Sequence, residues 1–237
     1  MLIDPLYLAL LAPGLLLALW AQWRTQSAFS RGKEVPAESG LTGAQAAAEV
    51  MRAGGVTGVV IEPVVGFLTD HYDPGGKVLR LSPDVYYGQS LSAVGVAAHE
   101  AGHAIQDATR YPLLAVRKGL VPAASIGRGL SWILILIGFV LMAAQSVWGQ
   151  PVMLLGIGGF SLTVLFQLVN LPVEFDASRR ARLMLVDHGI VTEQEDAVVK
   201  RVLDAAALTY VAATLTAVLT LLYFLIRSGL LGSSRDE

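Results

Sequence analysis

Long apolar stretches alternate with two polar segments along the chain. Four windows approach or reach the roughly 20 residues that a helix needs to cross a bilayer, and each is nearly free of charge: 6–23, 130–148, 151–171 and 208–226. Trp and Tyr residues lie near the window ends, as is typical of the membrane–water interface. The pattern predicts a mainly α-helical integral membrane protein with about four transmembrane helices.

The predicted organisation follows from these windows. Transmembrane helices occupy 1–23, 130–148, 151–171 and 208–227, a polar domain occupies 24–129, a polar helical segment occupies 172–207, and a short tail occupies 228–237. No basic residue precedes the first helix and no small-residue cleavage site follows it, so we expect a retained anchor.

The basic residues predict the orientation of the chain. Fifteen of the 17 Lys and Arg residues fall in the two polar segments. Because basic residues near span ends favour the cytoplasmic side, we expect both polar segments in the cytoplasm and both termini outside. The predicted location is the cell (inner or plasma) membrane.

Within the first polar segment, the pattern changes from helical to extended and back. Residues 43–53 are Ala-rich and are followed by two glycines, which predicts a short helix. The β-branched run 59–61 and the turn residues 73–76 predict a small antiparallel β-sheet with a hairpin. Ser90 or Ser92 is expected to cap a helix that ends near Ala108.

Two further helices are expected after the third span. One begins near Glu174 and stops at Gly189. Thr192 and Glu195 form a capping-box pattern for the other, which continues into the fourth span.

Composition narrows the functional classes. Apolar residues make up 54% of the chain and charged residues only 15%, against about 25% charged in soluble domains. The net charge of −2 gives no reason to expect nucleic acid as a partner. The chain has no cysteine, which excludes disulfides and thiolate metal ligands.

The chemistry is carried by His99-Glu100-Ala101-Gly102-His103, an H-E-x-x-H motif on the predicted helix that ends near Ala108. Residues four apart share a helix face, so both imidazoles can bind one zinc ion. Glu100 lies beside them, where it can take a proton from a zinc-bound water that attacks a peptide carbonyl. The motif predicts a catalytic zinc centre with one Zn²⁺ per chain.

A catalytic zinc needs a third protein ligand. Glu174 is the best candidate, because it follows the third span on the same side as the motif. Ser178 shares its face and could hydrogen-bond a ligand. Asp176 lies about 200° round the helix from Glu174, so both cannot easily bind one ion.

The functional interpretation of four other residues is less specific. His71 and Tyr72, on the predicted hairpin, could stabilise the oxyanion, although a surface role for the strand histidine is the commoner case. Asp107 is expected to be a solvated helix end, and His188 a structural residue before a helix-ending glycine.

Longer strings support a family resemblance. They are 68–74 (LTDHYDP), 81–86 (LSPDVY), 99–108 (HEAGHAIQDA) and 174–181 (EFDASRRA). With them the chain resembles the bacterial YugP-type neutral zinc metallopeptidases through most of its length, and more distantly the HtpX-like and CAAX-prenyl membrane proteases. The resemblance implies a zincin-like cytoplasmic domain with zinc on His99, His103 and Glu174. The distant relatives carry an acidic residue where this chain has Ser178.

The expected function is therefore a membrane-bound zinc metalloendopeptidase that cleaves proteins or peptides, including membrane proteins, near the cytoplasmic face. One alternative is a non-catalytic zinc-binding scaffold or adaptor, against which the intact Glu100 argues. An intramembrane protease is disfavoured because 89–110 is polar, and a metal transporter because the spans carry almost no ionisable ligands. Substrate, partners and oligomeric state are left open by the sequence.

Overall fold

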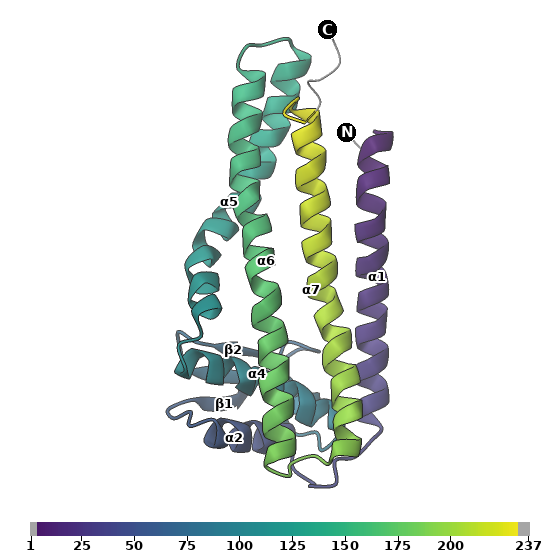
Figure 1. The fold of residues 1–237 in the computed structure, drawn as a ribbon, viewed down its shortest axis with the longest axis vertical. Coiled ribbons are helices and arrows are strands. Elements are labelled where there is room, and N and C mark those ends of the chain that lie inside the picture. The colour runs from purple at the N-terminus through teal and green to yellow at the C-terminus, as the bar shows by residue number, and fades with distance from the viewer. Residues whose placement is uncertain (1–3, 232–237) are drawn as a thin grey trace. The chain divides into compact units, whose positions relative to one another are not determined.

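Four long helices dominate the fold. The computed structural model describes residues 4–231, and its long helices are α1 (Pro5–Lys33), α5 (Pro112–Ala143), α6 (Gly149–Asp187) and α7 (Glu193–Arg227) (Figure 1). All four are long and apolar enough to cross a membrane. The four predicted spanning helices are thus confirmed as candidate spans. Helices α1, α6 and α7 extend beyond their predicted windows at both ends, whereas α5 begins before its window and ends at Ala143, short of the predicted end at 148.

The chain divides into two compact units. The helical unit contains, of the described residues, 4–19, 115–171 and 210–231, and the motif unit contains 20–114 and 172–209. The motif unit therefore unites most of the first polar segment with the second. Residues 115–129 belong to the helical unit instead, because α5 begins at Pro112, well before the predicted span at 130.

The helical unit packs through its glycines and exposes its aliphatic side chains. A Cβ on Gly127 would lie 2.8 Å from the Gly159 carbonyl oxygen, so α5 and α6 approach closely here. Leu8, Leu15 and Ile133 are each more than half exposed. This distribution suits helices whose outer faces contact lipid rather than water.

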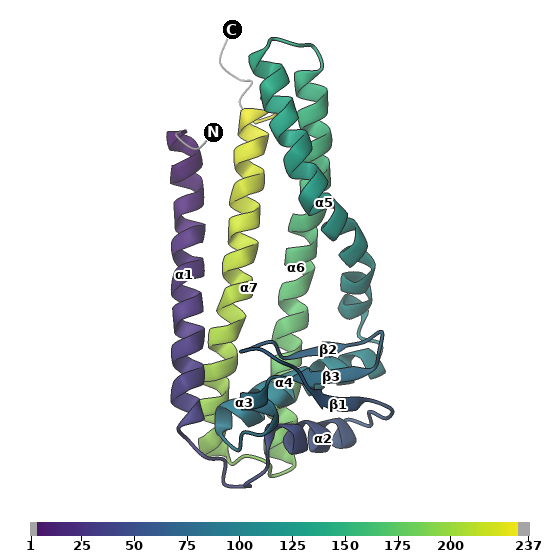
Figure 2. The same ribbon diagram turned by 180° about the vertical axis from the view of Figure 1, so that it is seen from behind.

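The motif unit holds a three-stranded sheet beside short helices. Strands β1 (Val60–Pro63), β2 (His71–Asp73) and β3 (Val78–Leu81) have the order β1-β3-β2 (Figure 2). The unit also contains helices α2 (Gly43–Ala53), α3 (Pro83–Tyr86) and α4 (Leu91–Ala108), together with 20–33 of α1, 172–187 of α6 and 193–209 of α7. Its core includes the fully buried Val50, Leu79, Leu81, Leu91 and Val94.

The sheet is confirmed, but one of its two pairings differs from the prediction. The β2–β3 hairpin is antiparallel, with Tyr72 opposite Leu79, whereas β1 pairs with β3 in parallel, with Ile61 opposite Leu79. The prediction assumed that strands adjacent in sequence pair. The connection between β1 and β2 is instead long enough to carry the chain past β3, so the last strand lies in the middle.

Helix α6 corrects a second expectation. No new helix begins near Glu174, because α6 runs without interruption from the third predicted span through Pro172 to Asp187. Proline removes only one N–H from the helical ladder, and here the helix continues through it. Glu174 is consequently carried on a helix that is continuous with the third predicted span.

Two predicted caps are confirmed, and a third is added by the structure. The side chain of Ser90 accepts from the Ala93 N–H at the start of α4, as predicted, and Thr42 forms an additional capping box with Gln45 at α2. Thr192 and Glu195 bond reciprocally at the start of α7, which runs on into the fourth predicted span. Gly189, with φ of 65°, follows the end of α6.

Candidate active site

Helix α4 presents the motif residues within the motif unit. Small residues at 95, 97, 98, 101, 102 and 104 let neighbouring elements approach this helix closely. His103 is buried, and His99 and Glu100 are half-buried. The face that carries the histidines therefore lies against other parts of the unit, and the facing element is the 172–187 part of α6.

Two histidines and one carboxylate converge between α4 and α6. The Nε2 atoms of His99 and His103 lie 3.3 Å and 3.4 Å from Oε2 of Glu174. The two imidazole rings meet edge to face, with centroids 4.8 Å apart. One ligand atom from each of the three residues lies within 4.8 Å of the others, which forms a candidate metal site.

The other ring nitrogen of each histidine has a hydrogen-bond partner. Nδ1 of His99 lies 3.0 Å from the Ser178 hydroxyl, and Nδ1 of His103 lies 3.0 Å from Oε1 of Gln106. Bonds of this kind orient metal-binding imidazoles in proteins. Both rings consequently turn Nε2 toward Glu174.

This donor set fits zinc. Two neutral imidazole nitrogens and one carboxylate oxygen match the three protein ligands of a catalytic zinc site, which keeps a fourth position open. The acid-base character of Glu174 agrees, because a ligand must be deprotonated. Burial raises the pKa of Glu174, but His103 and His99, when they carry a proton on Nε2, outweigh burial and hold that pKa well below its usual range.

Glu100 is held by the edge strand of the sheet. The backbone N–H of Tyr72, on β2, donates to Oε2 of Glu100 at 3.0 Å. Asp70, the residue just before this strand, accepts hydrogen bonds from the backbone N–H and the hydroxyl of Ser82. Burial raises the pKa of Asp70, and the negative charge of Glu100 adds to that rise, so the two carboxyl groups interact.

The weaker sequence candidates have varied surroundings. The Tyr72 hydroxyl donates to Oδ2 of Asp107 at 2.8 Å. Burial is the larger cause that raises the pKa of Tyr72, and this hydrogen bond is the next largest. His71 is exposed, with Nδ1 2.8 Å from the Thr69 carbonyl oxygen. His188 is exposed just beyond α6.

The expectation for Asp107 is wrong. Its side chain is only 10% exposed, and it accepts from Tyr72 and forms an ion pair with Lys77. The hairpin folds over the end of α4, which turns a residue expected to be solvated into a half-buried acceptor. Asp107 therefore ties the hairpin strand to the motif helix.

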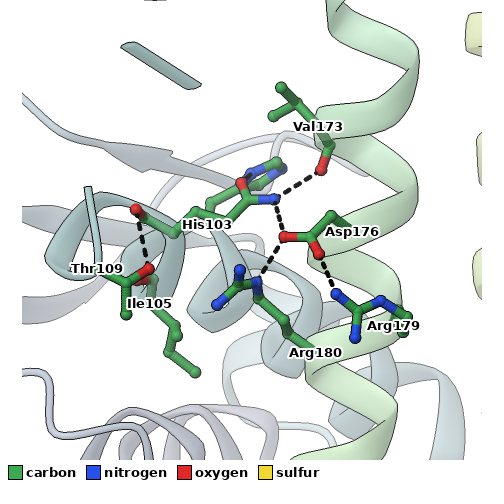
Figure 3. A network of polar contacts seen from close by, with 8 residues as sticks. His103, Ile105, Thr109, Val173, Asp176, Arg179 and Arg180 are labelled. Carbon is green, nitrogen blue, oxygen red and sulfur yellow. Dashed lines mark hydrogen bonds and ion pairs between the residues drawn. The ribbon is translucent and has the colours of Figure 1, made fainter. Parts of the chain in front are cut away.

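Sequence reasoning missed a polar network behind His103. Gln106 is fully buried and donates from its amide nitrogen to the Val173 carbonyl and to Asp176. Asp176 also forms ion pairs with Arg179 and Arg180 (Figure 3). Burial raises the pKa of Asp176, but the hydrogen bonds from Gln106, Arg180 and Arg179 lower this pKa by more than burial raises it. Asp176 is therefore a carboxylate. The only sequence signal was the position of Gln106 one turn after the motif.

Gly102 allows α4 and α6 to pack closely at the candidate site. A Cβ at this position would lie 2.5 Å from the backbone oxygen of Ala177, on the turn of α6 that follows Glu174. Backbone atoms cannot rotate away as a flexible side chain can. The glycine inside the motif is therefore required by helix packing at the site.

We expect Gly102→Ala to reduce both stability and zinc content, because α4 and α6 must separate to admit the methyl group. Overpacking of this kind costs about 1–3 kcal/mol. Melting temperature in detergent and zinc per chain measure the effect. Gly158→Ala, in α6 where an added Cβ has no neighbour within 4 Å, is the matched control and should be neutral. Equal behaviour of both variants would contradict the packing argument.

Comparison with known proteins supports zinc as the metal. The family described as "Putative neutral zinc metallopeptidase" matches residues 7–229. The chain is 43% identical over 232 residues to the "Putative membrane protease YugP" of Bacillus subtilis (strain 168), which covers 98% of this chain and 99% of that protein. No solved structure matches.

Proposed function

Because this chain belongs to the neutral zinc metallopeptidase family, we propose that it is a membrane-bound zinc endopeptidase that cleaves proteins or peptides close to the membrane. The observation that carries the proposal is the convergence of His99, His103 and Glu174 beside Glu100, whose carboxylate is held by the N–H of Tyr72. Four apolar helices on the same chain give the protein its multi-pass membrane character.

The proposed roles follow from the contacts. His99, His103 and Glu174 hold one zinc ion, and Ser178 orients His99 through its hydroxyl. Zinc at such a site supplies positive charge that polarises a peptide carbonyl and lowers the pKa of water to about 7.

Glu100 is the proposed proton carrier. The bond from Tyr72 occupies Oε2, and the carboxylate can use its other oxygen to take a proton from the attacking water. The same carboxyl group then delivers that proton to the leaving amine. A scaffold that only kept zinc would need the three ligands but not a carboxylate fixed beside them, so Glu100 favours an enzyme over a scaffold.

The proposed location of the chemistry is the cytoplasmic face. Most Lys and Arg residues of the chain lie in the segments that make up the motif unit, and basic residues near span ends favour the cytoplasm. Substrates would then be proteins or peptides at that face. His71 and Tyr72 stay candidates for the oxyanion; the Tyr72 hydroxyl already donates to Asp107.

The proposal is tested with purified protein in liposomes. We expect cleavage of a membrane-anchored substrate whose scissile segment lies close to the bilayer, loss of cleavage with a chelator, and recovery with zinc but not magnesium. The same segment as a soluble peptide should be cleaved more slowly. Cleavage that resists chelation would overturn the zinc mechanism, and equal cleavage of any unfolded soluble protein would overturn the membrane-proximal substrate class.

A further inference from the structure

The buried amide of Gln106 makes three hydrogen bonds beside the candidate metal site. Its oxygen lies 3.0 Å from Nδ1 of His103. Its nitrogen lies 2.8 Å from the Val173 carbonyl oxygen and 2.9 Å from Oδ2 of Asp176. An amide nitrogen carries two hydrogens, and both are used by these two acceptors.

The chemistry of the partners fixes which way the amide points. The Val173 carbonyl and the Asp176 carboxylate can only accept, so the nitrogen of Gln106 must face them. In the reversed orientation, the amide oxygen would lie against two other oxygens in a buried place, which is strongly unfavourable. The oxygen of Gln106 therefore faces His103, and Nδ1 of His103 must be the donor.

Asp176 is itself held in place. It forms ion pairs with Arg179 and Arg180 on the same helix, and the guanidinium of Arg180 lies 5.5 Å from the centre of the Tyr111 ring. Figure 3 shows Asp176 between the two arginines, close to the Val173 carbonyl. The acceptor that orients Gln106 thus has little freedom to turn away.

We propose that Gln106 and Asp176 are positioning residues for zinc: they hold the proton of His103 on Nδ1 and so leave Nε2 as the metal-binding nitrogen. This rests on the proposed function, because it concerns the same metal centre. Without the acceptor at Nδ1, a neutral His103 can carry its proton on Nε2 and donate it to the Glu174 carboxylate, 3.4 Å away. Zinc would then have to displace that proton.

The two histidines differ in this respect. The partner of His99 is the hydroxyl of Ser178, which can either donate or accept and therefore does not select a tautomer. The partner of His103 can only accept in its fixed orientation. The network also joins the motif helix to α6 two residues after Glu174, so it couples the two ligand-bearing helices.

The first test uses the unaltered protein. The chain has only four histidines, so ¹⁵N-histidine labelling gives few signals. We expect the His103 proton on Nδ1, slow to exchange with water, in the zinc-loaded protein, and Nδ1 still bonded to Gln106 after zinc removal. A neutral His103 that carries its proton on Nε2 in the zinc-free protein would overturn the proposal, whereas a protein that binds no zinc would overturn the proposed function instead.

The second test exchanges the amide and the carboxylate between positions 106 and 176. Gln106→Glu places a carboxylate against Asp176, and we expect zinc affinity to fall by about 10- to 100-fold, as for other hydrogen-bond partners of metal ligands. Adding Asp176→Asn restores an amide donor opposite the new carboxylate and keeps the net charge of the network. The bond from residue 106 to the Val173 carbonyl is lost in both variants, so comparing them isolates the contact between 106 and 176. We expect the double variant to regain at least about tenfold in affinity, a coupling that independent sites do not show.

Zinc affinity is measured by chelator competition, and the absorption spectrum of the Co²⁺-loaded protein reports the ligand environment. Melting of the zinc-free proteins shows whether each variant folds. A double variant no better than Gln106→Glu alone, with both folded, would contradict a positioning role. If Gln106→Glu does not fold, a double variant that folds and binds zinc supports the pairing, and one that folds without binding zinc opposes it.

Discussion

Replacing Glu100 with Gln is expected to abolish peptide cleavage while zinc stays bound. The amide keeps the size of the side chain and can still accept the hydrogen bond from the Tyr72 N–H. It cannot take a proton from water at neutral pH, so the general-base step is lost. Such steps contribute about 10²- to 10⁴-fold to rate, and kcat for the membrane-anchored substrate should fall by that factor.

The measurement pairs cleavage rate with zinc per chain for each purified variant. Glu49→Gln is the matched control, because Glu49 lies on α2 and pairs with Arg52 at the surface. It should keep both zinc and activity. A Glu100→Gln variant that cleaves at the rate of the unaltered protein would exclude Glu100 as the base, and one that also loses zinc would point to a structural role for this carboxylate.

The features that the sequence predicts well are those that depend on the spacing of nearby residues. His99 and His103 lie four residues apart on a capped helix, and the cap at Ser90 is itself a local signal. The spanning windows depend only on runs of apolar residues, and the Thr192–Glu195 capping box on a three-residue spacing. Each of these features is set by neighbours in the chain, so no tertiary information was needed.

What the sequence did not predict depends on contacts between distant segments. Gln106 and Asp176 are 70 residues apart, and their pairing exists only because Gly102 lets α4 lie against α6. The sequence position of Asp107 indicates a solvated helix end, because the hairpin that covers it is placed by contacts between distant segments. The parallel β1–β3 pairing was missed for the same reason, since a turn signal identifies a hairpin but not the strand on its far side.

The position of Glu174 combines both kinds of information. The sequence indicated a carboxylate just after a span, on the side of the motif, but the structure makes it part of the continuous helix α6. A ligand on a helix anchored in the membrane has its position set by the packing of α6 against α4. The third candidate ligand therefore depends on a contact within the motif unit, between α4 and the 172–187 part of α6, that no local pattern in the sequence reveals.

Glu174→Gln is accordingly expected to remove zinc from the purified protein. Glu174 is almost fully buried and faces the Nε2 atoms of both histidines, so the amide fits the same space without the negative charge that strengthens zinc binding. The loss of affinity should exceed the roughly 10- to 100-fold caused by changing a hydrogen-bond partner of a ligand. Glu193→Gln, an exposed residue in the first turn of α7, is the matched control and should keep about one zinc per chain. Both variants are then exposed to the same chelator. If Glu174→Gln keeps its zinc as fully as Glu193→Gln does, Glu174 is excluded as the third ligand, and the two histidines must bind zinc with another group.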